Sequence, residues 1–241
     1  MHIHILQVAG HPELRSNKDT NGGFGTVNDF GKGLVSRVLK EYKNRSMNFP
    51  EILPAYVNAI LKAQGHTVTY AWNDVPPDAD IVLIQTSIVN FQHELDWVQK
   101  VKRRSPQVKV GFIGGMSGAN PHLYQDKADF VVVGEVENAL LQKDIASFSG
   151  IVDGGLTSDL DLLPFPDWSH IQTWKKGYGL VSRGESRLLP MSSSRGCPMT
   201  CGYYCTYPLT QGKKLRTRSP ELVVAEAEYL QKDFEIGRAH V

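Results

Sequence analysis

Three cysteines, the only ones in this 241-residue chain, stand within nine residues as Cys197, Cys201 and Cys205. Cysteine thiolates ligate iron–sulfur clusters, and a cubane cluster takes one thiolate per iron. Three of them on one short loop would hold three irons of a 4Fe-4S cluster and leave the fourth open to a substrate or cofactor. Buried structural cysteines, a disulfide with one thiol left over, and an incomplete zinc site are the alternatives. An odd number of cysteines disfavours a disulfide framework, and no histidine follows at zinc-finger spacing, so we interpret the loop as a cluster site.

The residues around these cysteines resemble the cluster motif of the radical S-adenosylmethionine (SAM) enzymes. Ser194-Arg195-Gly196-Cys197-Pro198 opens the loop, and the aromatic Tyr204 precedes its last cysteine. The usual loop of that family is Cys-x3-Cys-x2-Cys, whereas this chain has Cys-x3-Cys-x3-Cys. The extra residue is either a bulge, for which Gly202 can supply a positive φ, or the mark of a damaged site. We favour the bulge.

The resemblance implies a reaction and the residues that carry it. Cys197, Cys201 and Cys205 would hold the 4Fe-4S cluster, and its open iron would bind the amino and carboxylate groups of SAM. Reductive cleavage of SAM would yield methionine and a 5'-deoxyadenosyl radical, with an electron from a donor such as flavodoxin or ferredoxin. Tyr204 would contact the adenine, or Tyr203 in view of the altered spacing.

Ahead of the cysteines, short apolar runs alternate with amphipathic segments, which is typical of βα units on a parallel sheet. Several runs are apolar almost throughout, as strands covered on both faces should be. This pattern predicts a doubly wound, Rossmann-like α/β domain. The expected strands are Ile3–Ala9, Thr67–Trp72, Ile81–Thr86, Val108–Ile113 and Phe130–Val133. Apolar residues recur at helical spacing over 34–42, 52–61 and 91–101, and Ser219-Pro220-Glu221 predicts a helix start.

Small residues follow three of these strands, and in a parallel sheet the carboxyl ends of the strands form the ligand-binding edge. The order of these segments resembles the cobalamin-binding domain that precedes many radical SAM cores, over about residues 1–155. The resemblance implies a corrinoid pocket lined by Thr86, Ser87, Gly114, Gly115, Gly134 and Glu135. Plain turns and strand-end caps are the alternative. The motif Asp-x-His-x-x-Gly is absent, so a bound corrinoid is expected to lack a histidine ligand from it.

The positions of the prolines and the resemblances above predict how the chain is divided into domains. The segment around Pro164 and Pro166 can continue neither a helix nor a central strand, so it is interpreted as a linker. The resemblance to the radical SAM enzymes implies that Leu188–Ser192 is the first strand of a partial (β/α) barrel that is cut short. The last six residues resemble a translated sequencing adapter. The expected parts are a cobalamin-binding-like domain over 1–158, a linker over 159–187, the start of a radical SAM domain over 188–235 and an artefactual tail over 236–241.

The overall charge and hydropathy exclude some partners. The net charge of +1 gives no electrostatic argument for nucleic acid, and no apolar run reaches the length of a membrane span. The cysteine usage fits a reducing cytoplasm. The resemblance implies that the chain is part of a radical SAM enzyme, inactive on its own, that acts on a small molecule by methyl transfer, cyclisation or rearrangement. The alternative is a non-catalytic corrinoid- or nucleotide-binding module with a vestigial cluster loop.

Overall fold

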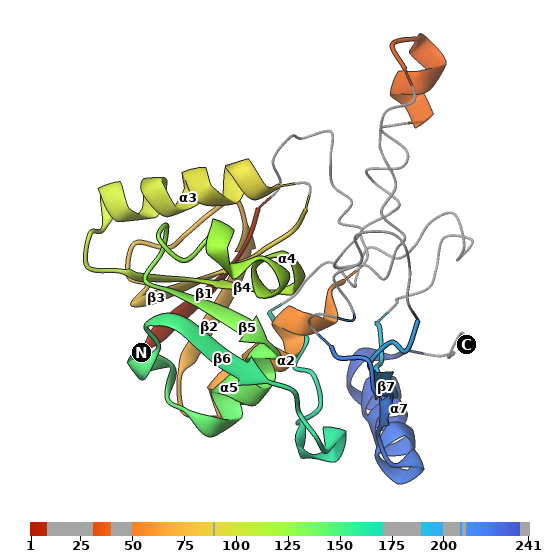
Figure 1. Ribbon diagram of the computed structural model, residues 1–241. Coiled ribbons are helices and arrows are strands. Elements are labelled where there is room, and N and C mark those ends of the chain that lie inside the picture. Colours follow the sequence, from red (N-terminus) through yellow and green to blue (C-terminus); the bar gives the residue numbers. More distant parts are fainter. Residues whose placement is uncertain are drawn as a thin grey trace.

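The computed structural model describes residues 1–8, 31–39, 50–88, 90–170, 189–199, 208 and 211–236. Its centre is a six-stranded parallel sheet in the order β2-β1-β3-β4-β5-β6 (Figure 1). The strands are β1 (His2–Gln7), β2 (Thr67–Trp72), β3 (Ile81–Gln85), β4 (Lys109–Ile113), β5 (Phe130–Gly134) and β6 (Gly150–Gly155). The predicted α/β class and parallel sheet are confirmed. All five residues of β3 are buried, as expected of a strand covered on both faces.

Helices cover both faces of the sheet (Figure 1). On one face, α2 and α5 pack against apolar side chains of β1, β3 and β5; on the other, α3 and α4 enclose a second core around Phe112 and Tyr124. The bounds are α2 (Ile52–Ala63), α3 (Phe91–Arg104), α4 (Gly115–Ala119) and α5 (Val136–Gln142). The predicted helices over 52–61 and 91–101 are confirmed, and residues 34–39 of the stretch 34–42 are helical. No helix in the described ranges is both long and apolar enough to cross a membrane.

The sixth strand, β6, was not among the predicted elements. Its sequence, Gly150-Ile-Val-Asp-Gly-Gly155, holds only two adjacent apolar residues, so neither the period of an exposed strand nor the apolar run of a buried one is visible. It pairs in parallel with β5, and the register shifts between Val133 and Gly134. Its single neighbour makes it an edge strand, where a weak apolar pattern is enough.

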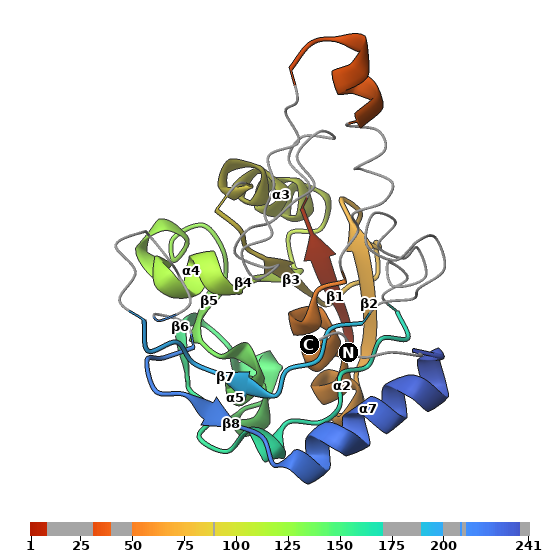
Figure 2. The ribbon, with the colours of Figure 1, turned by 90° about the vertical axis from the view of Figure 1, so that its right-hand side faces the viewer.

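The C-terminal part of the described chain packs beside this domain through α7 (Pro220–Phe234). Leu230 and Phe234 of α7 share a buried cluster with Ala55 of α2 and with Trp168. Ser219 caps the helix by accepting a hydrogen bond from the Leu222 amide at 3.4 Å, with Pro220 in the first turn, as predicted. The short strands β7 (Ser194–Arg195) and β8 (Arg216–Thr217) precede α7 and lie near α5 (Figure 2).

A buried histidine in β1 makes the fold sensitive to pH. His4 is 1% exposed; its Nδ1 and Nε2 lie 2.8 Å from the Thr69 hydroxyl and the Asp74 carbonyl oxygen. Burial lowers the pKa of His4 from 6.5 to about 4, so between these values the unfolded chain binds a proton that the folded chain does not. Stability should therefore fall as the pH drops through this window, by on the order of 3 kcal/mol.

Urea unfolding of the wild type and His4→Gln between pH 7 and 4.5 tests this expectation. Carboxylates with lowered pKa, such as Asp129, also lose stabilisation in acid, so the informative quantity is the difference between the two proteins at each pH. The wild type should lose more stability than His4→Gln as the pH falls. Parallel pH profiles would contradict the assignment to His4.

Candidate functional site

Of the three predicted cysteine ligands, Cys197 is the one that lies in the described part of the chain. Cys197 is half-buried, and its thiol is free. The predicted ligands Cys201 and Cys205 and the predicted adenine contacts Tyr203 and Tyr204 lie outside the described residues. What the structure shows is the base from which the loop departs.

This base is a two-stranded antiparallel ribbon formed by β7 and β8. Ser194 pairs with Thr217 and Arg195 with Arg216. Beyond the ribbon the Cys197 amide donates to the Gly212 carbonyl oxygen at 3.0 Å. The backbone thus runs out from Cys197 and returns at Gly212, so both ends of the cysteine loop are joined by hydrogen bonds.

Gly196 makes this close approach of the two chain segments possible. Its φ is +104°, and a Cβ atom built there would lie 2.1 Å from the Lys214 carbonyl oxygen. Only glycine adopts such a φ without strain, and a side chain would also collide with backbone that has no rotamer to change. The glycine before the first cysteine is therefore required by the geometry of the base.

The predicted barrel strand Leu188–Ser192 is not a strand in the described residues. Residues 189–193 are irregular, and the strand that delivers the cysteines is β7, which is paired with β8 and is antiparallel. Pro190 has no amide hydrogen to donate to a ladder, and the Ser192 hydroxyl donates to the Ser194 carbonyl oxygen at 3.1 Å. Both features favour a turn-like backbone over a barrel strand.

Two arginines connect this ribbon to the N-terminus of α5, where Glu135 is the N-cap residue and Glu137 lies in the first turn. Arg216 Nη2 donates to Glu135 Oε1 at 2.7 Å, and Arg195 Nη2 donates to Glu137 Oε1 at 2.7 Å. Arg195 Nη1 also lies 3.6 Å from Glu135 Oε1. The arginine side chains are 9% exposed and the glutamates 3%, so these are desolvated pairs. We call this group of four residues the Arg–Glu clamp.

Thr157 completes the environment of the Glu135 carboxylate, because its amide donates to Glu135 Oε2 at 2.8 Å. Burial alone would raise the pKa of Glu135, but the Arg216 hydrogen bonds, the Arg195 charge and the Thr157 amide outweigh it and hold that pKa below its usual value. The carboxylate is therefore ionised and fully engaged. A ligand at this edge of the sheet would meet the backbone at 134–135, not the carboxylate.

The other predicted pocket residues lie at the carboxyl ends of neighbouring strands, as expected. Thr86 and Ser87 follow β3, and both are buried. The Thr86 hydroxyl oxygen lies 3.0 Å from the Ile113 carbonyl oxygen and 3.0 Å from Ser117 Oγ, within hydrogen-bonding distance of both, whereas the Ser87 hydroxyl accepts from the Asn90 amide at 3.2 Å. These hydroxyls join β3 to β4, α4 and the start of α3. Their role in a pocket stays a prediction.

The glycines predicted to line the pocket end the next two strands. Gly114 follows β4 and Gly115 begins α4, while Gly134 is the last residue of β5. They share the carboxyl edge with Thr86, although Gly134 approaches the backbone of Gly155 on β6. The structure thus brings the six predicted residues to one edge of the sheet, and corrinoid binding there stays a prediction.

A polar group at the switch point of the sheet was not predicted. Gln7 ends β1 and Gln85 ends β3, the pair of strands between which the chain reverses its winding direction. The Gln7 side-chain amide donates to Gln85 Oε1 and, at 2.6 Å, to Glu51 Oε2, and Gln85 also donates to Glu51. All three are at most 5% exposed. The available sequence signal was a glutamine at the last position of each of the strands β1 and β3.

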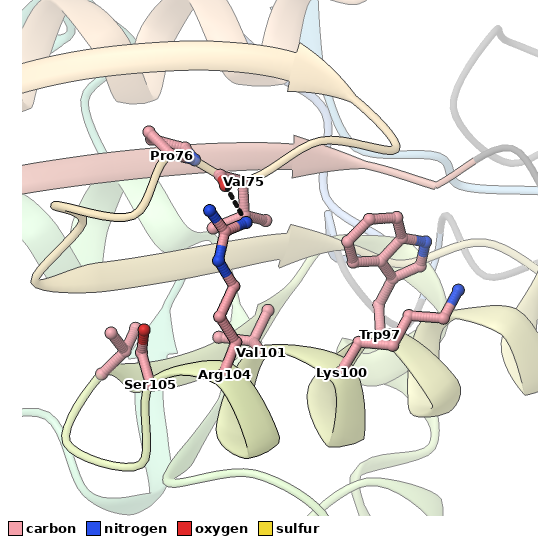
Figure 3. Close-up of a pocket in the computed structure, with 8 residues that line it drawn as sticks. Val75, Pro76, Trp97, Lys100, Val101, Arg104 and Ser105 are labelled. Carbon is pink, nitrogen blue, oxygen red and sulfur yellow. Dashed lines mark hydrogen bonds between the residues drawn. The ribbon is translucent and has the colours of Figure 1, made fainter.

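One cavity in the described structure lies at the opposite edge (Figure 3). It has a volume of about 120 Å³ and lies between the last turns of α3 and the segment at Val75 and Pro76. Arg104 Nη1 donates to the Val75 carbonyl oxygen at 3.3 Å across it. Since α3 begins at the carboxyl edge and ends at the amino edge, this cavity is remote from the cysteine loop.

No protein-family model matches the chain. It is 28% identical over 197 residues to the tRNA-2-methylthio-N(6)-dimethylallyladenosine synthase of Flavobacterium psychrophilum, covering 77% of this chain and 37% of that enzyme. It is 26% identical over 230 residues to the anaerobic magnesium-protoporphyrin IX monomethyl ester cyclase of Rubrivivax gelatinosus, covering 79% and 40%. These relatives support a radical SAM family. A third, the bacteriochlorophyllide d C-8(2)-methyltransferase of Chlorobaculum tepidum, is 26% identical over 166 residues, covering 65% and 34%.

The chain therefore spans well under half the length of each of these radical SAM relatives. The matches are distant, and the names of the relatives cover a tRNA-modifying synthase, a cyclase and a methyltransferase. They agree on a class of enzyme and differ in substrate.

Proposed function

We propose that this chain carries the cluster loop of a radical SAM enzyme, with Cys197, Cys201 and Cys205 as ligands of a 4Fe-4S cluster. The observation that carries the proposal is the loop base, where a free, half-buried thiol follows a glycine-dependent reversal and the returning backbone accepts from the Cys197 amide. Thiolates are the donors that such clusters require. The chemistry supplied there, when the cluster and SAM are bound, is the reductive cleavage of SAM.

The chain's own residues have defined parts in this proposal. The three cysteines hold the metal, Tyr204 or Tyr203 contacts the adenine of SAM, and the Arg–Glu clamp joins the loop base to α5. In the whole protein we propose an electron donor such as flavodoxin or ferredoxin, a small-molecule substrate and a cytoplasmic location. Methyl transfer, cyclisation and rearrangement remain the candidate outcomes.

We propose further that the parallel sheet is a corrinoid-binding domain, with its ligand at the carboxyl edge near Thr86, Ser87, Gly114, Gly115, Gly134 and Glu135. Support comes from the sheet order, whose switch point lies between β1 and β3, and from glycine backbone at the ends of β4 and β5. His2 and His4 sit toward the amino end of β1 and hydrogen-bond to Thr69, so neither is placed to ligate a cobalt at that edge.

Anaerobic reconstitution of the 241-residue chain with iron and sulfide tests the cluster. The wild type should acquire about four irons per chain and a visible charge-transfer absorption, since cluster irons are bonded to thiolate and sulfide. The triple variant Cys197→Ala, Cys201→Ala, Cys205→Ala should acquire neither. Met199→Ala is a matched control, because Met199 lies in the same loop and is 65% exposed.

Equal iron binding by the wild type and the triple variant would refute the proposal. A cluster with an open iron should also change its electron paramagnetic resonance spectrum when SAM is added to the reduced chain. An unchanged spectrum would contradict SAM binding, while the proposal of a metal site would still stand.

Titration of the full chain with hydroxocobalamin tests the corrinoid proposal. We expect a spectral change and co-elution on gel filtration for the wild type, and weaker retention for Gly115→Leu, which adds bulk at the carboxyl edge. Lys109→Met changes the opposite end of the adjacent strand β4 and should bind as the wild type does. No spectral change and no retention would contradict corrinoid binding. Retention of corrinoid by a chain that takes up no iron would favour a binding module with a vestigial loop.

A further inference from the structure

The ribbon that carries Cys197 is too short to hold its own geometry. β7 and β8 have two residues each, and an isolated hairpin even of ordinary length is at best marginally stable in water. Two further backbone hydrogen bonds flank it, from the Cys197 amide to Gly212 and from the Arg218 amide to Ser193 at 2.9 Å. The position of the ribbon must therefore come from tertiary contacts.

The Arg–Glu clamp supplies contacts of the right kind. Its arginines are paired across the ribbon, and both contact glutamates at the N-terminus of α5, far away in sequence. The planar guanidinium of arginine fixes direction as well as distance, which an apolar contact does not. Arg195 is held from a second side by the ring of Tyr56, whose centroid is 5.2 Å from the guanidinium carbon.

Burial of these charges points to a role in orientation. Replacing a buried ion pair by apolar residues of similar size is often neutral or stabilising, so such a pair is weak evidence for a stabilising role. We propose that Glu135 and Glu137 are positioning residues for the cysteine loop, acting through Arg216 and Arg195 to fix the backbone at Cys197. This inference rests on the proposed cluster function, but its structural part can be tested without metal.

Hydrogen exchange of the iron-free chain tests the structural part. In Glu135→Gln the Cys197 amide should exchange about tenfold faster or more, because tenfold corresponds to ~1.4 kcal/mol, near the lower end of what a hydrogen bond to a charged group contributes. Arg216→Lys, which keeps the charge and loses the forked geometry, should show the same effect and serves if Glu135→Gln does not fold. The amides of β3 should keep wild-type protection in both variants.

Asp129→Asn is the matched control. Asp129 pairs with Lys102 at 2.6 Å and accepts from the Val110 amide, so it is also a carboxylate bound to a cation and a backbone amide, but it directly precedes β5 at the amino end of the sheet. It should leave exchange at Cys197 unchanged. Wild-type protection of Cys197 in Glu135→Gln and Arg216→Lys would overturn the inference. Equal acceleration at Cys197 and in β3 would also overturn it, because it would show a general loss of stability.

Release of iron to a chelator from the reconstituted chain tests the functional part. Glu135→Gln should release iron faster than the wild type and than Asp129→Asn. If the wild type takes up no iron, the proposed function fails while the exchange result still decides whether the clamp orders the loop base. If wild type and Glu135→Gln form the same cluster and release iron at the same rate, the positioning role fails and the cluster proposal stands.

Discussion

Replacing Gly196 by alanine is expected to abolish iron binding at the cysteine loop while the parallel sheet stays folded. Alanine at a φ of +104° is strained, by about 1–3 kcal/mol for a non-glycine residue in a sparsely populated region. Its Cβ would also lie 2.1 Å from the Lys214 carbonyl oxygen, so the backbone at 196 and 214 must separate. That separation breaks the base of the loop, and Cys197 then departs in a different direction.

The iron content after reconstitution measures the loss of iron binding. Circular dichroism of the same samples measures whether the parallel sheet stays folded. Gly150→Ala is the control, because Gly150 also has a positive φ, +59°, but a Cβ atom there meets nothing within 4 Å. It introduces strain at the sheet edge without a clash and should bind iron as the wild type does. Wild-type iron uptake by Gly196→Ala would show that the loop does not depend on the observed base.

The sheet could be predicted from sequence because burial on both faces leaves a plain signal. β3 is apolar over most of its length. The segments that form the helices α2 and α3 repeat apolar residues at helical spacing. β6 gave no such signal, since an edge strand with Ile151 and Val152 as its only large apolar residues needs its neighbour β5 to form. The local pattern therefore predicted five strands, including the edge strand β2, and missed the edge strand β6.

The cysteine ligand candidates could be predicted because their spacing is local, whereas the clamp could not. Arg195 and Glu137 are 58 positions apart, and Arg216 and Glu135 are 81 apart. Only the fold brings them together. Glu135 was predicted at the carboxyl edge and lies there, but its carboxylate turns toward the cysteine loop. Its sequence context, after an apolar strand and a glycine, indicates that Glu135 lies at the carboxyl edge of the sheet. It does not indicate that the carboxylate binds Arg216.

Replacing Glu226 by alanine is expected to destabilise the chain by about 3–5 kcal/mol, the usual effect of removing one member of a buried ion pair. Glu226 of α7 accepts from Arg218 Nη1, and the two side chains are 0% and 1% exposed. Burial raises the pKa of Glu226 and outweighs the attraction of Arg218, so the pair already carries a desolvation penalty. Without the carboxylate, the Arg218 guanidinium stays buried with no counter-charge in its hydrogen-bonding reach among the described residues.

Urea unfolding of Glu226→Ala, of Arg218→Met and of the double variant Arg218→Met, Glu226→Leu measures this effect. The double variant should be more stable than Glu226→Ala, because it removes both desolvated charges and fills the space with apolar atoms. Glu228→Ala changes an exposed glutamate on the same helix and should shift stability by no more than about 0.5 kcal/mol. A loss in Glu226→Ala no larger than that in Glu228→Ala would mean that water reaches Arg218. The contact of α7 with α2 would then rest on the apolar cluster at Ala55 and Leu230 alone.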